Sequence, residues 1–253
     1  MALPYSGEHE QFRETVRRFV EKEIAPYHAQ WEKDGAISRE AWLKAGAEGL
    51  LLTNVPAEYG GGDADFLTSV IMIEEMMSHI FSGPGFRLHS DIVAPYILHL
   101  GTEEQKQRLL PAMARGEMIG AIAMTEPGTG SDLQNIRTLA RREGDEFVIS
   151  GQKTFITNGQ LADFVITACK TDASAGAKGV SLILVETARK GFSRGRNLEK
   201  VGMKAQDTSE LFYDEVRVPV TNLLGKEGGG FGHLMSELPQ ERLLVGITAV
   251  TVM

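Results

Sequence analysis

AMTEPGTGSDLQN at Ala123–Asn135 combines two glycines with small hydroxyl residues in one short stretch, and KTFITNG at Lys153–Gly159 adds an aromatic residue and two threonines. Glycine has no Cβ, so the main chain can approach a ligand closely, and successive backbone N–H groups in such a turn can bind an anion. Each residue alone is also typical of a turn, a strand or a core. Together the two segments predict a cradle for a flat cofactor that carries phosphate.

Short apolar runs surround these segments. From about Met118 to about Leu224 the runs IGAIAM, EFVIS, DFVITAC and GVSLILVE alternate with turns that contain glycine. Short strands at close spacing, with no helical pattern between them, indicate an antiparallel barrel or sandwich.

The residues before this region have helical periodicity. Apolar residues recur at helix spacing from Phe12 to Ile24, with acidic residues in the first turn, and Pro26 is expected to end this helix. Thr102 and Gln105 fit a capping box, in which each side chain satisfies a free backbone donor, and the helix that follows is expected to reach Arg115. Further helices are expected at Ser38–Leu43, Phe66–Met77 and Asp91–Leu100.

The helical pattern returns after the glycine-rich stretch Gly225–Gly230 and continues to Met253. The sequence therefore predicts an α+β protein in three parts. These are an N-terminal α-helical domain at 1–117, a middle antiparallel β-barrel or sandwich domain at 118–225, and the first helix of a C-terminal helical bundle at 226–253.

Composition narrows the function classes. The chain has 253 residues, is 42% hydrophobic and carries a net charge of −8, so it can build real cores and lacks the excess of basic residues that a nucleic-acid or anionic membrane surface needs. No apolar stretch is long enough to span a membrane. Cys169 is the single cysteine, and the six histidines do not have the spacing of zinc ligands, so we expect no metal site. The opening residues lack the features of a signal peptide, and we expect a cytoplasmic protein.

TEPGTGSD and FITNG, taken with GMKAQDTSELFYDEVRVP at Gly202–Pro219 and ELPQERLLV at Glu237–Val245, resemble the acyl-CoA dehydrogenase family. The last two segments are similar to its long-chain branch in particular. The likeness covers the whole chain and four separate motifs in the family's order. Because that family continues into a larger helical bundle, the resemblance also implies that most of the C-terminal helical domain is missing from this chain.

The resemblance implies an FAD enzyme of fatty acid β-oxidation that converts a fatty acyl-CoA, of long chain by its branch, into trans-2-enoyl-CoA. The reaction removes a proton from Cα and transfers a hydride from Cβ to the flavin. Electron-transfer flavoprotein would accept the electrons, and the family architecture implies a homotetramer or dimer. An oxygen-reactive acyl-CoA oxidase is a near relative. The alternative is a non-catalytic module that binds acyl-CoA or a partner, or one half of a split dehydrogenase.

The resemblance also assigns residues to the flavin. Met124 and Thr125 would contact the pyrimidine side of the isoalloxazine, Gly130 and Ser131 the pyrophosphate, and the run Phe155, Ile156 and Thr157 the ring near N5. The family frequently has tryptophan where this chain has Phe155, which lacks the indole donor. Asp132 could stabilise the turn through side-chain hydrogen bonds.

The catalytic base implied by the long-chain branch is Glu241. We expect Glu241 to share an apolar helix face with Val245, Thr248 and Val252, where desolvation would raise its pKa. A solvated helix charge is the alternative. The substrate contacts implied by resemblance are Ser131, Leu238, Pro239 and Arg242, and an ordinary helix salt bridge is the alternative for Arg242. Arg87 and Ser90 are expected at the acyl cavity or in its support.

Overall fold

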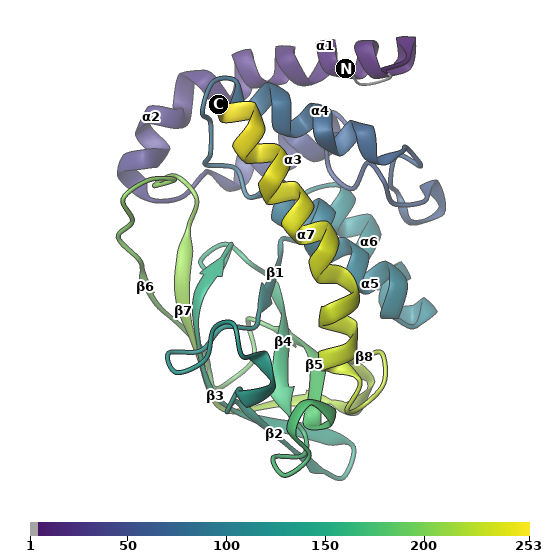
Figure 1. Cartoon of the computed structure of the whole chain (residues 1–253), viewed down its shortest axis with the longest axis vertical. Helices are drawn as coiled ribbons and strands as arrows, with labels where there is room; N and C mark the ends of the chain where they lie inside the picture. The colour runs from purple at the N-terminus through teal and green to yellow at the C-terminus, as the bar shows by residue number, and fades with distance from the viewer. Residues whose placement is uncertain (1–4) are drawn as a thin grey trace.

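The computed structural model describes residues 5–253, with helices in the first part, strands in the middle and one long helix at the end (Figure 1). The predicted order of helical part, β-rich part and final helix is confirmed. The domain limits at 117/118 and 225/226 stay a prediction. None of the helices within residues 5–253 is both long enough and apolar enough to cross a membrane.

Side-chain caps define several helix starts in the first part. Asp65 accepts a hydrogen bond from the backbone of Leu67 at 2.9 Å, and the Thr102 capping box with Gln105 is present as predicted. The helices are α1 (Gly7–Phe19), α2 (Ala25–Asp34), α3 (Arg39–Ala47), α4 (Phe66–Met77), α5 (Ala94–Leu100) and α6 (Glu103–Ala114). The range predicted for α4 is correct at both ends.

The prediction that Pro26 ends the first helix is wrong. A π-helical turn at Val20–Ile24 joins α1 to α2, and Pro26 occupies the first turn of α2. The missing N–H of proline costs nothing there, because first-turn donors have no partner within the helix. A second π-helical turn, at Leu88–Val93, likewise extends the helix expected at Asp91–Leu100 toward its N-terminus.

The middle part forms one eight-stranded sheet in the order β6-β7-β3-β2-β4-β5-β8, with β1 paired to β4 outside this path. The sheet is not closed into a barrel. Most pairs are antiparallel, but β1 and β2 both run parallel to β4. The strands are β1 (Gly120–Ala123), β2 (Leu139–Glu143), β3 (Glu146–Thr157), β4 (Phe164–Lys170), β5 (Val180–Glu186), β6 (Phe192–Asn197), β7 (Thr208–Pro219) and β8 (Leu223–Leu224).

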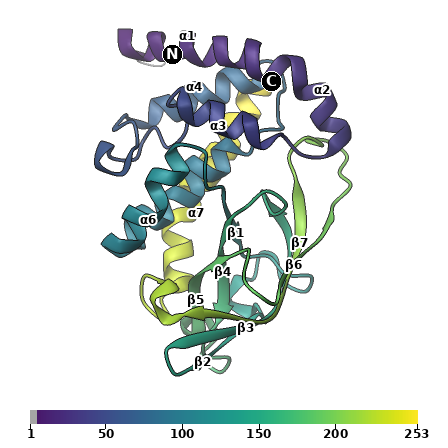
Figure 2. The same ribbon diagram turned by 180° about the vertical axis from the view of Figure 1, so that it is seen from behind.

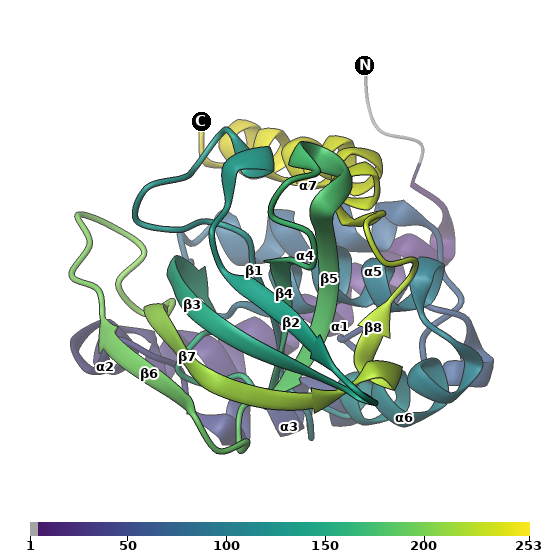
Figure 3. The same ribbon diagram turned by 90° about the horizontal axis from the view of Figure 1, so that it is seen from below.

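Strand β4 is buried along its whole length because both of its faces are covered. Phe164 and Ile166 pack into the core shared with the helices, whereas Val165 and Cys169 point into a second core enclosed by the bent sheet. Side chains alternate between the two faces of a strand, so a continuous apolar run fits this position. Figure 3 shows the bent sheet from below, with β2, β3 and β7 nearest the viewer.

The last helix, α7 (Gly230–Val252), connects the two parts of the molecule. It begins beside β5 and β8 and runs up against α4 and the π-helical turn at Leu88–Val93 (Figure 1). In the view from behind, α6 lies in front of α7 and the sheet lies below the helices (Figure 2). Helix α7 thereby forms one wall of the region between the helices and the sheet.

Candidate functional site

The two motifs that predict the cofactor cradle lie side by side. The Thr154 amide donates to the Thr125 carbonyl at 2.9 Å, and the Lys153 ammonium donates to the Met124 carbonyl at 3.0 Å. Reciprocal backbone hydrogen bonds between Glu126 and Thr129 close the turn at Pro127–Gly128. The turn is therefore attached to the end of β3.

A buried ion pair holds this attachment. Lys153 is fully buried, Glu126 is 7% exposed, and their Nζ and Oε1 atoms are 2.8 Å apart. The Glu126 carboxylate also accepts from the amides of Arg137 at 2.6 Å and Thr138 at 2.9 Å. Burial alone would raise the pKa of Glu126, but the ammonium and these donors hold it below its usual value.

The turn residues that the resemblance assigns to the cofactor are accessible. Gly130 and Ser131 are exposed, while Met124 and Thr125 are half-buried. A Cβ built on Gly128 or Gly130 would meet no atom within 4 Å, so the space beside both glycines is open. Asp132 receives a hydrogen bond from the Asn135 amide at 2.5 Å, which agrees with its predicted role inside the turn.

Phe155 occupies an uncommon backbone conformation. Its φ is +59°, and the register between β3 and β7 shifts between Lys153 and Ile156, so a bulge turns the ring outward and leaves it 67% exposed. A left-handed backbone is rare for an aromatic residue and concentrates at functional sites. Ile156 is buried in the second core and Thr157 is half-buried, so Ile156 can offer a ligand only its backbone.

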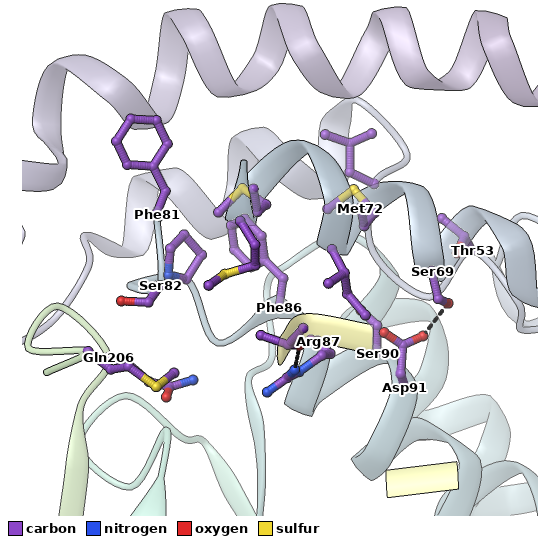
Figure 4. A pocket seen from close by; sticks show the side chains of 17 residues that line it. Thr53, Ser69, Met72, Phe81, Ser82, Phe86, Arg87, Ser90, Asp91 and Gln206 are labelled. Carbon is purple, nitrogen blue, oxygen red and sulfur yellow. Dashed lines mark hydrogen bonds between the residues drawn. The ribbon is translucent and has the colours of Figure 1, made fainter. Parts of the chain in front are cut away.

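A mostly apolar cavity lies between helix α4, the segment 81–91 and the segment 203–206 (Figure 4). It is partly open to solvent, and about 60 Å³ inside it can hold the centres of water-sized molecules. Its lining comes from the segment 50–53, α4, the segment 81–91, the segment 203–206 and one residue of α7. Most lining side chains are apolar: Leu50, Met72, Ile73, Met76, Met77, Phe81, Pro84, Phe86 and Met203.

The segment 203–207 links the cavity to the FITNG turn. Met203 and Gln206 line the cavity, and the Asp207 carbonyl accepts a hydrogen bond from the Asn158 amide at 3.2 Å. The Asn158 side chain then donates to the Gly85 carbonyl at 3.4 Å. A Cβ on Gly85 would lie 1.9 Å from the Asn158 Oδ1, so this contact requires glycine at position 85.

Glu241 lies on the buried side of α7 but does not line the cavity. Its Oε1 accepts a hydrogen bond from the hydroxyl of Tyr96 at 2.9 Å, and Tyr96 is fully buried. Burial raises the pKa of Glu241, as does the charge of Glu237, while the Tyr96 donor and the Arg242 charge oppose the rise.

The expected apolar face of α7 needs correction. Val245 is 60% exposed and Val252 is 47% exposed, so these residues do not surround the carboxylate. The packed side of the helix instead carries Glu241, buried Leu244 and half-buried Thr248. Val245 follows Leu244 by one residue, which rotates it about 100° away from the packed side.

The remaining residues on α7 divide by exposure. Leu238 packs against the main core, Pro239 and Arg242 are exposed, and Gln240 donates to the Asp91 carbonyl at 2.9 Å. No ion pair joins Arg242 to another of residues 5–253, so the alternative of a helix salt bridge has no partner there.

Arg87 and Ser90 belong to the cavity wall. Arg87 Nη1 donates to the Leu244 carbonyl at 3.2 Å and to the Thr248 hydroxyl, and the Ser90 hydroxyl accepts from the Leu52 amide at 3.1 Å. Within residues 5–253, no cluster of three or more histidine, cysteine, aspartate or glutamate side chains could hold a metal ion.

Sequence reasoning did not find three contacts of this region: the Lys153–Glu126 pair, the Tyr96–Glu241 hydrogen bond and the attachment of Arg87 to α7. One signal was available for the first. The first motif has Glu126 beside its turn and Asp132 further along, and the second has Lys153, of opposite charge, as its single charged residue. The partners of the other two are more than a hundred residues apart, so no local pattern joins them.

Comparison with known proteins shows which family the chain resembles. The N-terminal domain of acyl-CoA dehydrogenases matches residues 6–117, and their middle domain matches residues 121–216. The chain is 52% identical over 249 residues to the mitochondrial long-chain specific acyl-CoA dehydrogenase of Rattus norvegicus, covering 98% of this chain but 58% of that protein.

Two solved structures agree with this placement. An acyl-CoA dehydrogenase from Geobacillus kaustophilus is 52% identical, with a TM-score of 0.96 over 99% of this chain and 67% of that chain. An acyl-CoA dehydrogenase complexed with FAD from Bacillus anthracis is 32% identical, with a TM-score of 0.91 over 98% of this chain and 42% of that chain. The chain belongs to the acyl-CoA dehydrogenase family.

Proposed function

We propose that the chain provides the N-terminal domain (1–117), the middle domain (118–225) and the first helix (226–253) of a C-terminal domain in an FAD-dependent acyl-CoA dehydrogenase. The substrate is a fatty acyl-CoA, of long chain by its resemblance to the rat enzyme, and the product is trans-2-enoyl-CoA. The observation that carries this proposal is the chain of contacts that joins the TEPGTGSD turn to β3 beside the outward Phe155, and the FITNG turn through Asn158 to the walls of the apolar cavity.

The residues present fit a flavin. Open space beside Gly128 and Gly130 leaves room for a phosphate group against backbone N–H donors. The hydroxyls of Thr125 and Ser131 are accessible donors, and the exposed ring of Phe155 offers a surface for an aromatic system. A homologous enzyme from Bacillus anthracis has been solved with FAD. When bound, FAD supplies the acceptor for the hydride from Cβ.

Glu241 is our candidate for the base that takes the Cα proton. A base for this step needs a pKa close to the working pH, and burial shifts the pKa of Glu241 upward in that direction. The Tyr96 hydroxyl donates to the carboxylate, which favours its ionised form against the effect of burial and fixes its position. Because Glu241 does not line the cavity described above, its carboxylate has to reach the thioester from the side of α7.

The acyl chain would occupy the apolar cavity, and burial of its methylene groups there would contribute about 0.8 kcal/mol each. We assign Ser131, Leu238, Pro239 and Arg242 to the thioester end and the CoA portion. The exposed guanidinium of Arg242, with no ion-pair partner among residues 5–253, is suited to a polar or anionic part of CoA.

We further propose electron-transfer flavoprotein as the electron acceptor, a cytoplasmic location and a homotetrameric or dimeric assembly. The acceptor and the assembly follow from the resemblance to the family, and similarity to bacterial proteins supports the location. The chain spans 58% of the length of the rat enzyme. The position of Glu241 outside the cavity lining favours a second candidate function. That function is an acyl-CoA or partner-binding module, or one half of a split dehydrogenase.

A visible absorption spectrum of the purified protein tests the proposal. We expect a flavin spectrum that bleaches on anaerobic addition of a long-chain acyl-CoA, together with formation of the trans-2-enoyl product. A colourless protein that still binds acyl-CoA would favour the binding module. Oxygen consumption in step with turnover would indicate an oxidase instead of a dehydrogenase.

A further inference from the structure

The apolar cavity contains two ionisable side chains, Arg87 and Asp91. A cavity that only accepts a methyl-ended acyl chain has no use for a charged group, because a buried charge is costly unless it is paired. Both side chains come from the same turn of the chain, at the N-terminal side of α5, and Figure 4 shows them among the lining residues. Their hydrogen bonds therefore indicate what each can still bind.

Asp91 is already engaged. Its Oδ1 accepts from the Ser69 hydroxyl at 2.5 Å, a contact drawn in Figure 4, and its backbone carbonyl accepts from Gln240. Burial raises the pKa of its carboxyl to about 6, against the opposing effects of Ser69 and Arg87. Asp91 forms no ion pair with Arg87, since no carboxylate of residues 5–253 lies within 4.0 Å of that guanidinium.

Arg87 uses one of its three nitrogen atoms. Nη1 contacts the Leu244 carbonyl and the Thr248 hydroxyl on α7, whereas Nε and Nη2 make no hydrogen bond to any of residues 5–253. The Nε–Nη2 edge of a guanidinium carries two parallel N–H groups that match the two oxygens of a carboxylate. Burial lowers the pKa of Arg87, but a guanidinium stays charged in proteins.

We propose that Arg87 is a specificity-determining residue that binds a terminal carboxylate on the acyl group, so that the cavity takes acyl thioesters of dicarboxylic acids in preference to methyl-ended acyl thioesters of the same length. This inference rests on the proposed acyl-CoA function and names its substrate class. The contact of Nη1 with α7 fixes the guanidinium plane, and the apolar lining on the methionine and phenylalanine side accommodates the methylene chain.

Paired ligands test the proposal without any mutation. Each pair consists of a straight-chain alkyl-CoA thioether, which ends in a methyl group, and the alkyl-CoA thioether of equal length that ends in a carboxylate. Several chain lengths are compared. The thioether lacks the carbonyl of the thioester and does not react, so isothermal titration calorimetry on the flavin-loaded protein reports binding alone. We expect the ω-carboxy ligand to bind about tenfold or more tightly at the length that spans the cavity, as a charge-assisted hydrogen-bonded pair would provide.

Two variants locate the effect at the guanidinium. Arg87→Met keeps a long side chain but removes the charge, so the preference should disappear and the methyl-ended ligand should bind more tightly than in the wild type. Arg87→Lys keeps the charge but removes the two-pronged edge, so an intermediate preference is expected. Melting temperatures of both variants separate a folding defect from a binding effect, and the wild-type ligand pairs remain informative if a variant does not fold.

Equal affinities within every ligand pair, or a preference that survives in Arg87→Met, would overturn the assignment of Arg87 and leave the proposed acyl-CoA function standing. Failure of all the CoA ligands to bind would overturn the proposed function itself, and the inference with it.

Discussion

Lys153→Met is the substitution that most directly examines how the cofactor turn is held. Methionine has nearly the length of lysine but no charge, so Glu126 would remain as a buried carboxylate without a cation. Removing one partner of a buried ion pair costs about 3–5 kcal/mol of folding free energy. The Met124 carbonyl would also lose its donor, at a cost of about 1 kcal/mol. We expect a loss near 4 kcal/mol, because the two backbone amides at Arg137 and Thr138 continue to stabilise the carboxylate.

Urea denaturation of Lys153→Met, Glu126→Gln and the double variant provides the assay, with the flavin-to-protein ratio measured on the same preparations. The double variant should recover part of the loss, because it removes the uncompensated charge and leaves a neutral amide. Lys178→Met is a matched control on an exposed lysine. A Lys153→Met protein within 1 kcal/mol of the wild type, with a full complement of flavin, would refute the idea that this ion pair positions the turn.

Three further predictions concern the site. Tyr96→Phe removes the hydrogen-bond donor that favours ionised Glu241, so the pKa of Glu241 should rise. The acidic limb of the pH–rate profile should then move to higher pH, and a limb that does not move would contradict the role of Tyr96. Burial raises the pKa of Asp91 from 3.8 to about 6, so the folded state binds the carboxyl proton more tightly than the unfolded state does. The free energy of unfolding therefore falls as the pH rises from about 4 to about 6, by at most about 3 kcal/mol. Asp91→Asn should therefore raise the melting temperature at pH 8 and not at pH 3.5, and equal shifts at both pH values would argue against it. Phe155→Asn places a residue that tolerates a left-handed backbone at an exposed position, so the free energy of unfolding should stay the same or rise slightly. The variant should retain less flavin, and unchanged flavin retention would remove Phe155 from the cofactor site.

Local signals in the sequence were sufficient for several elements. The start of α6 follows from Thr102 and Gln105, whose side chains cap the same helix end, and α4 lies where its apolar periodicity places it. Pro26 misled because a proline in the first turn of a new helix has the same local appearance as one that ends a helix. The π-helical turn that joins α1 to α2 places Val20 and Ile24 in the main core, whose other members lie far away in the sequence.

Long-range contacts were beyond sequence reasoning. Strands β1, β4, β5 and the first part of β3 correspond to the apolar runs read from the sequence. The parallel pairing of β1 and β2 with β4 and the open edges of the sheet depend on which strands meet in space. Likewise, Val245 belongs to the same helical pattern as Thr248, yet only one side of α7 is covered by α4 and the turn at Leu88–Val93. The two motifs of the cradle were identified from glycine and hydroxyl residues, while the buried Lys153–Glu126 pair beneath them required the structure.

The most direct measurement of the central claim is anaerobic bleaching of the flavin band by a long-chain acyl-CoA in Glu241→Gln, compared with Glu237→Gln. Glu237 lies one helical turn before Glu241 on α7, and its carboxylate contacts the His99 ring at 2.9 Å. We predict that Glu241→Gln retains flavin but does not bleach, whereas Glu237→Gln bleaches at a rate close to that of the wild type. Bleaching of Glu241→Gln at the wild-type rate would contradict the assignment of Glu241 as the base.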